Sequence, residues 1–568
     1  MKNLKVQFKL IICVLLFLNT FNTLKAKNID EFDTAKDVTN YFSGILATNN
    51  NQYQKSYDYL RSLSNLEDSH YAYSKYYQHS LVALNKLKDA TNYSKKLEKK
   101  KIDNFESNLV SAVYYMERKD FDKALVYFEK LRDKSKPESI QNLLSASLYS
   151  WANFKNTKNL NEALNLLESI PKKFENFKNI QKTFAYCHFD SDQTDKIFTT
   201  LTSRADINYS RYFFFHANYL VSKNKQEKVK KILETSLNLD PKNLILNQLK
   251  IDIEQRKKFN NQFDCKDSRH VIAEILYIVA NGLATQQNYI ASNFYINLAK
   301  YLNPNFINFE MLYAENLLSI NEFSKAKNTY NEIQKHGSAY SWYASKMTAS
   351  ILINQEKKKE AIILLEKIFK EIKNPTTYEI FDYAEFLKNN EKYEESIEYY
   401  TKVINIIDRK NNLYGQAHDG RGVAHERTDQ WNEAEMDLLN SLSVTPNDAY
   451  VINYLAYSWI EKGINIEKSL NMLKKANRLR PNDGYIIDSL GWALFKLKNY
   501  KESKKYLQQA VRLMASDPVI NDHYADSLWM NNNSIQARYY WNYVLKLKKT
   551  KEKLKKKIEL KLLFGLKI

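Results

Sequence analysis

The stretch from Asp483 to Trp541 contains one pattern written twice. Leu490 matches Tyr524, and Leu507 matches Trp541, each at an offset of 34 residues. A fixed period of this length is the signature of a helical repeat array, in which each unit packs only against its neighbours. An array also explains how 568 residues fold without one very large core. The 10 glycines and 8 prolines favour long helices over a turn-rich β fold.

A small residue near the start of the second helix sets the register of each predicted helix pair. Two antiparallel helices approach closely only where a small side chain stands at the crossing. A bulky residue often follows four positions later, on the same helix face. Pro241, Pro304, Pro446 and Pro481 come just after second helices, where proline stops a helix. The predicted small positions are Ser56, Ala90, Ala124, Ala163, Ile197, Val229, Ser292, Ala326, Ala361, Ser396, Ala434, Ser469, Ser503 and Ala537, with Ile197 and Val229 as β-branched exceptions.

This pattern resembles the tetratricopeptide repeat over nearly the whole chain. The best matches are Leu490-Gly491-Trp492, Arg421-Gly422 with Ala434, and Ala476 with Pro481. The C-terminal part also looks like secreted tetratricopeptide-repeat proteins of Gram-negative bacteria, especially alphaproteobacteria. The resemblance implies an all-α, right-handed superhelical solenoid of antiparallel helix pairs, with roughly 13 or 14 repeats. It also implies that the first helices line a concave groove that binds a protein or peptide segment.

The spacing divides the chain after residue 26 into four segments. Residues 27–241 form an N-terminal array and residues 271–545 a C-terminal array. Between them, residues 242–270 are expected to hold an over-long helix and a polar connector, because two repeat lengths there contain one proline-terminated unit. Residues 546–568 read as a basic amphipathic helix, whose Leu547, Leu554, Ile558 and Leu562 cap the last repeat.

Residues 1–26 read as a cleaved secretory signal peptide. Lys2, Lys5 and Lys9 precede the apolar run from Leu10 to Leu18, and Ala26 is the small residue before the predicted cleavage site. The run is shorter than the roughly 20 residues that span a bilayer. We therefore expect an exported, periplasmic protein that begins at Lys27, and the alternative is an uncleaved anchor in the inner membrane.

Cys187 and Cys265 remain after the signal segment is removed. Cys187 lies in a helical apolar run and Cys265 in the polar connector, so we interpret them as two independent residues. Export would permit a single disulfide bond as the alternative.

The sequence contains no catalytic, cofactor or metal signature. Gly420-Arg421-Gly422 begins like a dinucleotide-binding loop, but no strand precedes it and no third glycine follows. His418 and His425 share one helix face, where packed histidines are a simpler interpretation than metal ligands. We therefore expect no enzyme activity and no cofactor.

A row of polar side chains recurs at the fifth position of four successive first helices. Asp419, Asn453, Asp488 and Asp522 occupy it, and Asp526 follows one turn after Asp522. By resemblance this position faces the groove, where exposed acceptors would suit an extended chain with Lys, Arg or free N–H groups. The alternative is that these residues bond neighbouring repeats. The predicted partner-binding set also includes the aromatic residues Tyr450, Tyr457, Tyr485, Trp492 and Trp529.

The formal net charge of +20 does not indicate nucleic-acid binding. The lysines alternate with glutamates on outer helix faces, as in residues 356–373. Only residues 546–557 are dense enough in lysine to attract an anionic membrane surface. We expect a non-catalytic scaffold of the cell envelope; the alternative is a recruitment module of a glycan- or peptidoglycan-processing system. The partner and the oligomeric state are not encoded in a recognisable motif.

Overall fold

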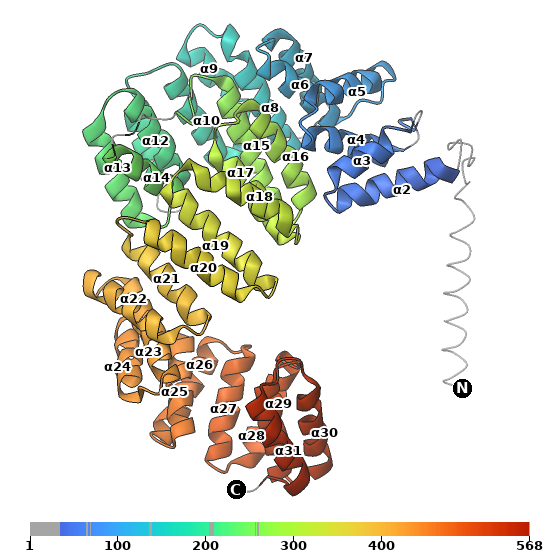
Figure 1. The fold of residues 1–568 in the computed structure, drawn as a ribbon. Helices are drawn as coiled ribbons and strands as arrows, with labels where there is room; N and C mark the ends of the chain where they lie inside the picture. Colours follow the sequence, from blue (N-terminus) through green and yellow to red (C-terminus); the bar gives the residue numbers. More distant parts are fainter. Residues whose placement is uncertain are drawn as a thin grey trace. The chain divides into compact units, whose positions relative to one another are not determined.

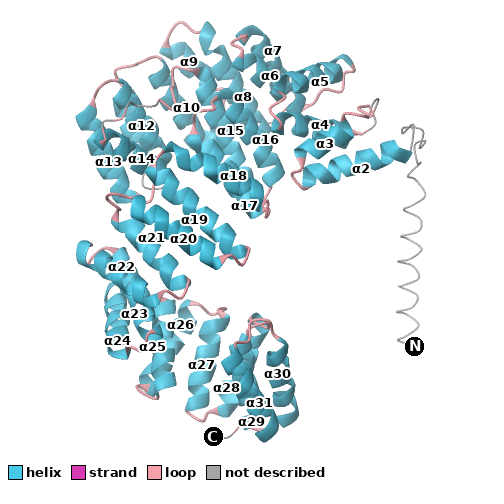
Figure 2. Cartoon of the chain, in the orientation of Figure 1, coloured by secondary structure: helices cyan, strands magenta, loops and turns pink. Residues whose placement is uncertain are grey.

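The computed structural model describes residues 35–63, 66–68, 70–133, 135, 139–203, 210–255, 257 and 261–566. The predicted signal segment, residues 1–26, lies outside these residues. The described part consists of α-helices, three short 3-10 helices and loops, without strands (Figures 1 and 2). None of these helices has the length and apolar character needed to cross a membrane. The predicted all-α solenoid of antiparallel helix pairs is confirmed.

The chain forms two compact units, which meet in sequence at Lys357 and Lys358 rather than within residues 242–270. In unit 1, eight helix pairs are described, and α14 and α19 stand outside them. The helices of unit 1 are α2 (Ala35–Asn49), α3 (Tyr53–Leu60), α4 (Tyr71–Ala83), α5 (Leu87–Lys99), α6 (Phe105–Glu117), α7 (Phe121–Asp133), α8 (Ile140–Asn153), α9 (Leu160–Leu167), α10 (Glu175–His188), α11 (Thr194–Thr202), α12 (Ser210–Ser222), α13 (Gln226–Leu239), α14 (Leu244–Glu254), α15 (Ser268–Thr285), α16 (Tyr289–Leu302), α17 (Ile307–Ser319), α18 (Phe323–Ile333) and α19 (Ser338–Asn354).

Unit 2 contains five helix pairs between a leading helix and a closing one. Its helices are α20 (Lys358–Glu371), α21 (Thr377–Asn389), α22 (Tyr393–Ile406), α23 (Asn412–Arg427), α24 (Trp431–Val444), α25 (Ala449–Lys462), α26 (Ile466–Leu479), α27 (Gly484–Lys496), α28 (Tyr500–Leu513), α29 (Pro518–Met530), α30 (Ser534–Lys546) and α31 (Glu552–Phe564).

Local sequence sets both ends of the first helices in unit 2. Asp448, Asp483 and Asp517 cap α25, α27 and α29, because each side chain accepts hydrogen bonds from the first free backbone N–H groups. In the turns that follow, Asn465, Lys498 and Asn532 adopt left-handed backbone conformations. Glycine commonly adopts this left-handed conformation at the ends of helices, and here Asn and Lys adopt it instead.

The small position of the second helix is buried in thirteen of the fourteen predicted places. Serine at this position bonds back to the first helix: Ser292 donates to the carbonyl of Ala280, and Ser503 to that of Gly491, each at 2.8 Å. The exception is Ile197, which is only half-buried. In α11 the closely packed pair is Thr194 and Phe198, both 1% exposed, so the predicted register is wrong there by three residues.

The predicted over-long helix is wrong. Helix α14 has 11 residues, and the described residues between it and α15 contain no second helix. A cleft of about 1060 Å³ lies between α13 and α14, with Leu233, Leu237 and Ile253 among its lining residues.

Cys187 and Cys265 form a disulfide bond, which corrects the interpretation of two independent cysteines. Their Cα atoms lie 5.9 Å apart across 78 residues of sequence. The bond ties the connector to α10, where Nδ1 of His188 also bonds the carbonyl of Cys265 at 3.0 Å. Sequence could not pair the two residues, because the connector reaches α10 only through the tertiary fold.

In unit 1 the first helices of the early pairs are covered by the chain itself. Helices α4 and α6 pack against α16, and α8 packs against α15. His79 of α4 stacks on Phe294 of α16, with ring centroids 4.4 Å apart. Glu274 of α15 is fully buried and accepts a hydrogen bond from Arg211 of α12 at 3.1 Å. The first helices α4, α6 and α8 therefore do not line an open groove, because α15 and α16 cover them.

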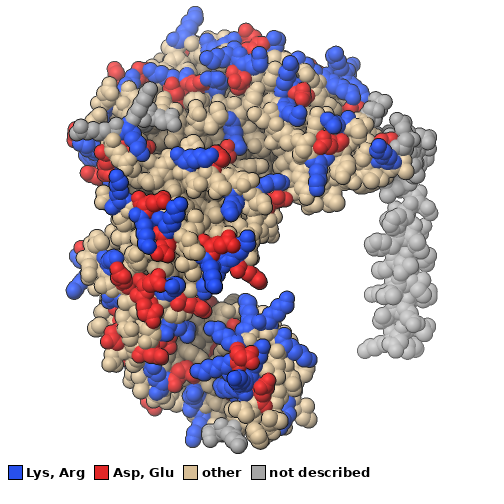
Figure 3. Space-filling view, viewed as in Figure 1, with Lys and Arg blue, Asp and Glu red and all other residues tan. Residues whose placement is uncertain are grey.

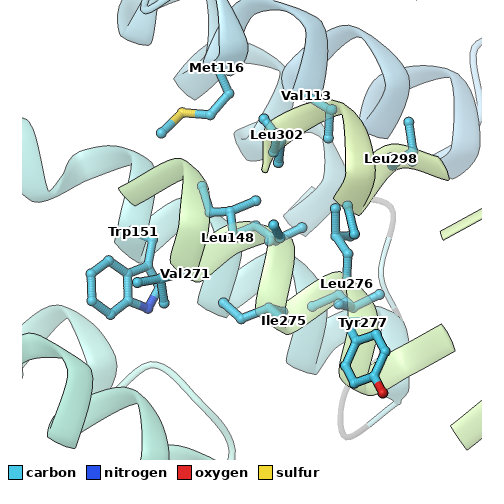
Figure 4. Close-up of a cluster of buried hydrophobic side chains, with 14 of the residues drawn as sticks. Val113, Met116, Leu148, Trp151, Val271, Ile275, Leu276, Tyr277, Leu298 and Leu302 are labelled. Atoms are coloured by element: carbon cyan, nitrogen blue, oxygen red, sulfur yellow. The ribbon is translucent and has the colours of Figure 1, made fainter. Parts of the chain in front are cut away.

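Figure 4 shows the apolar core that results from this packing. Helix α15 is buried on all sides over residues 271–277, which are apolar except for Glu274. The labelled core residues come from α6 (Val113, Met116), α8 (Leu148, Trp151), α15 (Val271, Ile275, Leu276, Tyr277) and α16 (Leu298, Leu302).

Helix α31 closes the last pair, as predicted for the C-terminal segment. Ile558 is fully buried, and Leu554 and Leu562 pack against the cluster around Trp541. The helix begins at Glu552 rather than 546, so Leu547 lies in the preceding turn instead of on the capping face.

Candidate functional site

The candidate site is the surface carried by the first helices of unit 2, here called the first-helix face: α21, α23, α25, α27 and α29. Helices α25, α27 and α29 pack side by side in this layer. The row formed by Asp419, Asn453, Asp488 and Asp522 lies on four of these helices and is called the polar ladder. The ladder divides into two halves with different surroundings.

At the C-terminal end of the ladder, the carboxylates form ion pairs with a lysine of the same chain. The ammonium of Lys561 on α31 lies 2.5 Å from Asp522 and 2.7 Å from both oxygens of Asp526. All three side chains are at most 5% exposed. Nε1 of Trp541 also donates to Asp526 at 3.0 Å. Burial and the adjacent Asp522 raise the pKa of Asp526 to about 6, against the opposing charge of Lys561.

Asp488 binds a histidine of the next repeat. Nδ1 of His523 lies 3.0 Å from the Asp488 carboxylate, and both side chains are buried. Trp492 stacks on His523 with ring centroids 3.9 Å apart, and its Nε1 donates to Glu461 at 2.6 Å. Burial lowers the pKa of His523, but the charge and hydrogen bond of Asp488 outweigh burial and leave the pKa above its ordinary value.

Asp488, Asp522 and Asp526 are therefore not the exposed acceptors that the sequence suggested. Each has a buried partner within the chain: Asp488 bonds the next repeat, as the alternative interpretation describes, whereas Asp522 and Asp526 bond the closing helix. Any contact that they make with a second protein has to compete with these internal bonds.

Asp419 and Asn453 form the other half, and they have unfilled acceptors. Asp419 is half-buried and has no hydrogen bond or ion pair to any described residue, while the Oδ1 atom of Asn453 is buried without a hydrogen-bond donor among them. Burial raises the pKa of Asp419 to about 6; the carboxylates of Asp448 and Glu385 add to this effect, and Lys388 opposes it. A buried or half-buried acceptor without a hydrogen bond is stabilised by any group that supplies a hydrogen-bond donor or a positive charge.

The five predicted aromatic residues have different environments. Tyr450 and Tyr485 are about half exposed, at 54% and 51%, and Tyr457 is half-buried. Trp492 is buried against His523. Trp529 is covered by Gly565, at which an added Cβ would lie 2.2 Å from the indole ring. Tyr450, Tyr457 and Tyr485 therefore remain available on the first-helix face, whereas Trp492 and Trp529 serve packing.

The glycine and histidine motifs of α23 have structural roles. Gly420 lies in mid-helix against Tyr400, and Nδ1 of His418 bonds Asp437 at 2.7 Å. Asp437 of α24 also accepts two hydrogen bonds from Arg421, both at 2.8 Å. Asp437 is not among the predicted site residues, although an Asp at a position where a second helix is expected to be buried is a detectable signal. No cluster of metal-binding side chains occurs in the described ranges.

Comparison with known proteins agrees with the repeat pattern. The tetratricopeptide repeat family model matches residues 380–408 and 487–516, which lie in unit 2. The TPR repeat-containing protein PA4667 of Pseudomonas aeruginosa is 26% identical over 136 residues, which are 23% of this chain and 21% of that protein. The match thus spans about a fifth of the relative's length. The comparisons thus identify tetratricopeptide repeats at residues 380–408 and 487–516, and proteins with this repeat are in general non-catalytic and bind protein or peptide partners.

Solved structures of repeat proteins are also similar to parts or most of this chain. A thermophilic TPR protein of Thermus thermophilus is 16% identical, with 33% of this chain and 100% of that chain covered and a TM-score of 0.29. In the Cut9–Hcn1 hetero-tetramer of the APC/C, the similar chain is 14% identical, with 94% and 97% covered and a TM-score of 0.38. MamA of Desulfovibrio magneticus is 14% identical, with 31% and 97% covered and a TM-score of 0.27.

Proposed function

We propose that this chain is a non-catalytic scaffold of the cell envelope that binds a segment of a partner protein on the first-helix face of unit 2. We place the binding surface on unit 2 because the corresponding surface in unit 1 is covered: α15 and α16 pack against the first helices α4, α6 and α8. The repeat family supports the class of partner, since its members bind protein or peptide segments.

The observation that carries the proposal is the pair of unfilled acceptors at Asp419 and Asn453. Lys561 illustrates the chemistry within the same chain, because a lysine ammonium binds the equivalent carboxylate, Asp522, two repeats beyond Asn453. A bound segment that places Lys, Arg or free backbone N–H groups against Asp419 and Asn453 would satisfy both acceptors. The exposed rings of Tyr450 and Tyr485 offer apolar contact beside them.

The envelope location rests on the sequence of residues 1–26 and on the disulfide bond. Disulfides form and persist in oxidising compartments such as the periplasm, and the Cys187–Cys265 bond fits such a location. N-terminal sequencing of the protein isolated from its native cells tests this part. The first residue is expected to be Lys27, and a protein that still begins at Met1 would contradict the cleaved signal.

A library of peptides with and without Lys and Arg tests the binding face directly. The full chain should select basic peptides, and the double variant Asp419→Asn/Asn453→Leu should bind them about tenfold or more weakly, because a charged hydrogen bond contributes roughly 1.5–3 kcal/mol. Glu394→Gln, an exposed change on the second helix α22, is the matched control and should bind normally. Equal binding by the double variant and the wild type would place the partner elsewhere.

A further inference from the structure

The closing helix α31 has two faces of different character. One face packs on the last repeat through Leu554, Ile558, Lys561 and Leu562. The opposite face carries Lys553, Lys556, Leu560, Leu563 and Phe564, whose spacing of three, four, three and one residues keeps them on one side of a helix. These five residues are called the exposed stripe.

The apolar end of the stripe is exposed to solvent. The side chains of Leu560, Leu563 and Phe564 are 58%, 71% and 63% exposed, and they follow one another in the last two turns of α31. The start of α30 lies beside these turns, because Arg538 donates a hydrogen bond to the carbonyl of Leu562. Ile535, three residues before Arg538, is 85% exposed and adds a further apolar side chain at this end.

The other end of the stripe is positively charged. Residues 546–568 contain ten lysines and two glutamates, a net charge of +8. Lys549, Lys553 and Lys556 are exposed and form no ion pair with any described residue. Figure 3 shows Lys and Arg gathered over the part of unit 2 where Figure 1 labels α30 and α31.

We propose that the exposed stripe of α31 binds the surface of an anionic lipid bilayer, with its leucines and Phe564 in the interface and its lysines at the headgroups. Unpaired lysines beside exposed apolar side chains are the chemistry of helices that lie on anionic membranes. A protein partner fits less well, because a stable protein interface covers about 800 Å² on each side, whereas this surface is one face of a single 13-residue helix. This surface is separate from the polar ladder, so the inference does not depend on the proposed function.

Flotation with lipid vesicles tests the inference. The full chain, and a chain starting at Lys27 that keeps every described helix, are mixed with phosphatidylcholine vesicles containing either no or about 30 mol% phosphatidylglycerol. Both chains should bind the anionic vesicles more strongly, and added salt should weaken this preference. The neutral vesicles measure any binding by the apolar N-terminal segment alone.

Three variants locate the contact. Lys549, Lys553 and Lys556 changed together to Gln should reduce binding to anionic vesicles by roughly tenfold or more. Leu560→Ser/Leu563→Ser should reduce it by a similar factor. The control changes Lys359, Lys367 and Lys370 of α20 to Gln, and it should bind as the wild type does.

All of the altered side chains are exposed, so the melting temperatures should match the wild type and show that each variant is folded. The inference is overturned if the wild-type chain binds neutral and anionic vesicles equally. It is also overturned if either the triple-lysine variant or the double-leucine variant keeps wild-type binding.

Discussion

Lys561 lies 2.7 Å from both carboxylate oxygens of Asp526, although 35 residues separate the two in sequence. The same ammonium reaches Asp522 at 2.5 Å, so one lysine binds two buried carboxylates of the last repeat and offsets part of their negative charge. Two neighbouring carboxylates without a cation would repel each other in a place with little water. The closing helix therefore stabilises the array end by charge as well as by apolar contact.

The first prediction concerns this lysine. Lys561→Met keeps most of the side-chain volume but leaves Asp522 and Asp526 buried without their cation, so α29 and α31 should lose roughly 3 kcal/mol of local stability. Hydrogen exchange of the amides in these helices measures the loss. Lys556→Met, an exposed change on the same helix, is the control. Unchanged exchange in Lys561→Met would mean that the lysine is not needed at the array end.

A second prediction concerns pH. The pKa of His523 is higher in the folded chain than its ordinary value of about 6.5, because the effect of Asp488 outweighs that of burial. The histidine therefore adds stability at pH values below about 6.5, and this contribution is lost as the pH rises through the folded-state pKa.

Thermal unfolding of the chain from about pH 6 to pH 9 should show a decline in stability that His523→Gln makes shallower. The buried Asp526, whose pKa is raised to about 6, changes stability in the same direction and is present in both proteins. Identical pH profiles for the two proteins would exclude His523 as a source of the decline.

The third prediction compares two glycines within helices. A Cβ at Gly420 would lie 2.4 Å from the ring of Tyr400, which is fully buried and donates its hydroxyl to Glu385. Gly420→Ala should therefore destabilise unit 2 by about 1–3 kcal/mol. At Gly282 nothing lies within 4 Å, so Gly282→Ala should stabilise α15 by about 0.5–1 kcal/mol. Hydrogen exchange should confine both effects to neighbouring helices.

The fourth prediction concerns the disulfide bond. Its removal by Cys187→Ser/Cys265→Ser should cost about 2–4 kcal/mol and loosen residues 261–267. Hydrogen exchange of the connector and the melting temperature check this. A reductant should lower the stability of the wild type to that of the double variant and leave the variant unchanged. A wild type insensitive to full reduction would contradict this role.

The repeat architecture could be predicted from sequence because its determinants are local. The small residue and the bulky residue four positions later lie on one helix, and the capping residues Asp448 and Asp483 are adjacent to the helices that they begin. The same locality explains the error at Ile197. Thr194 also provides a small side chain, and only the packing of Phe198 decides between the two registers.

The candidate site could be predicted only in part. The spacing of Asp419, Asn453, Asp488 and Asp522 placed them on four first helices, and the structure has them there, although Asp419 is the eighth residue of α23 and the other three are the fifth residues of their helices. Their partners did not follow from that spacing. His523 and Lys561 reach Asp488 and Asp522 from other repeats or from the closing helix, and nothing in the local sequence distinguishes them from solvated side chains.

The sequence by itself determined the repeating helix pairs, their turns and most of their register, because these depend on residues within about 40 positions of one another. The tertiary structure decided which surfaces are covered. Helices α15 and α16 cover the surface of the first helices α4, α6 and α8 in unit 1. The Cys187–Cys265 bond ties the connector to α10, and Lys561 binds the carboxylates at the end of the ladder. These contacts join distant segments, so they depend on how successive repeats are stacked, and a 34-residue period does not specify that stacking.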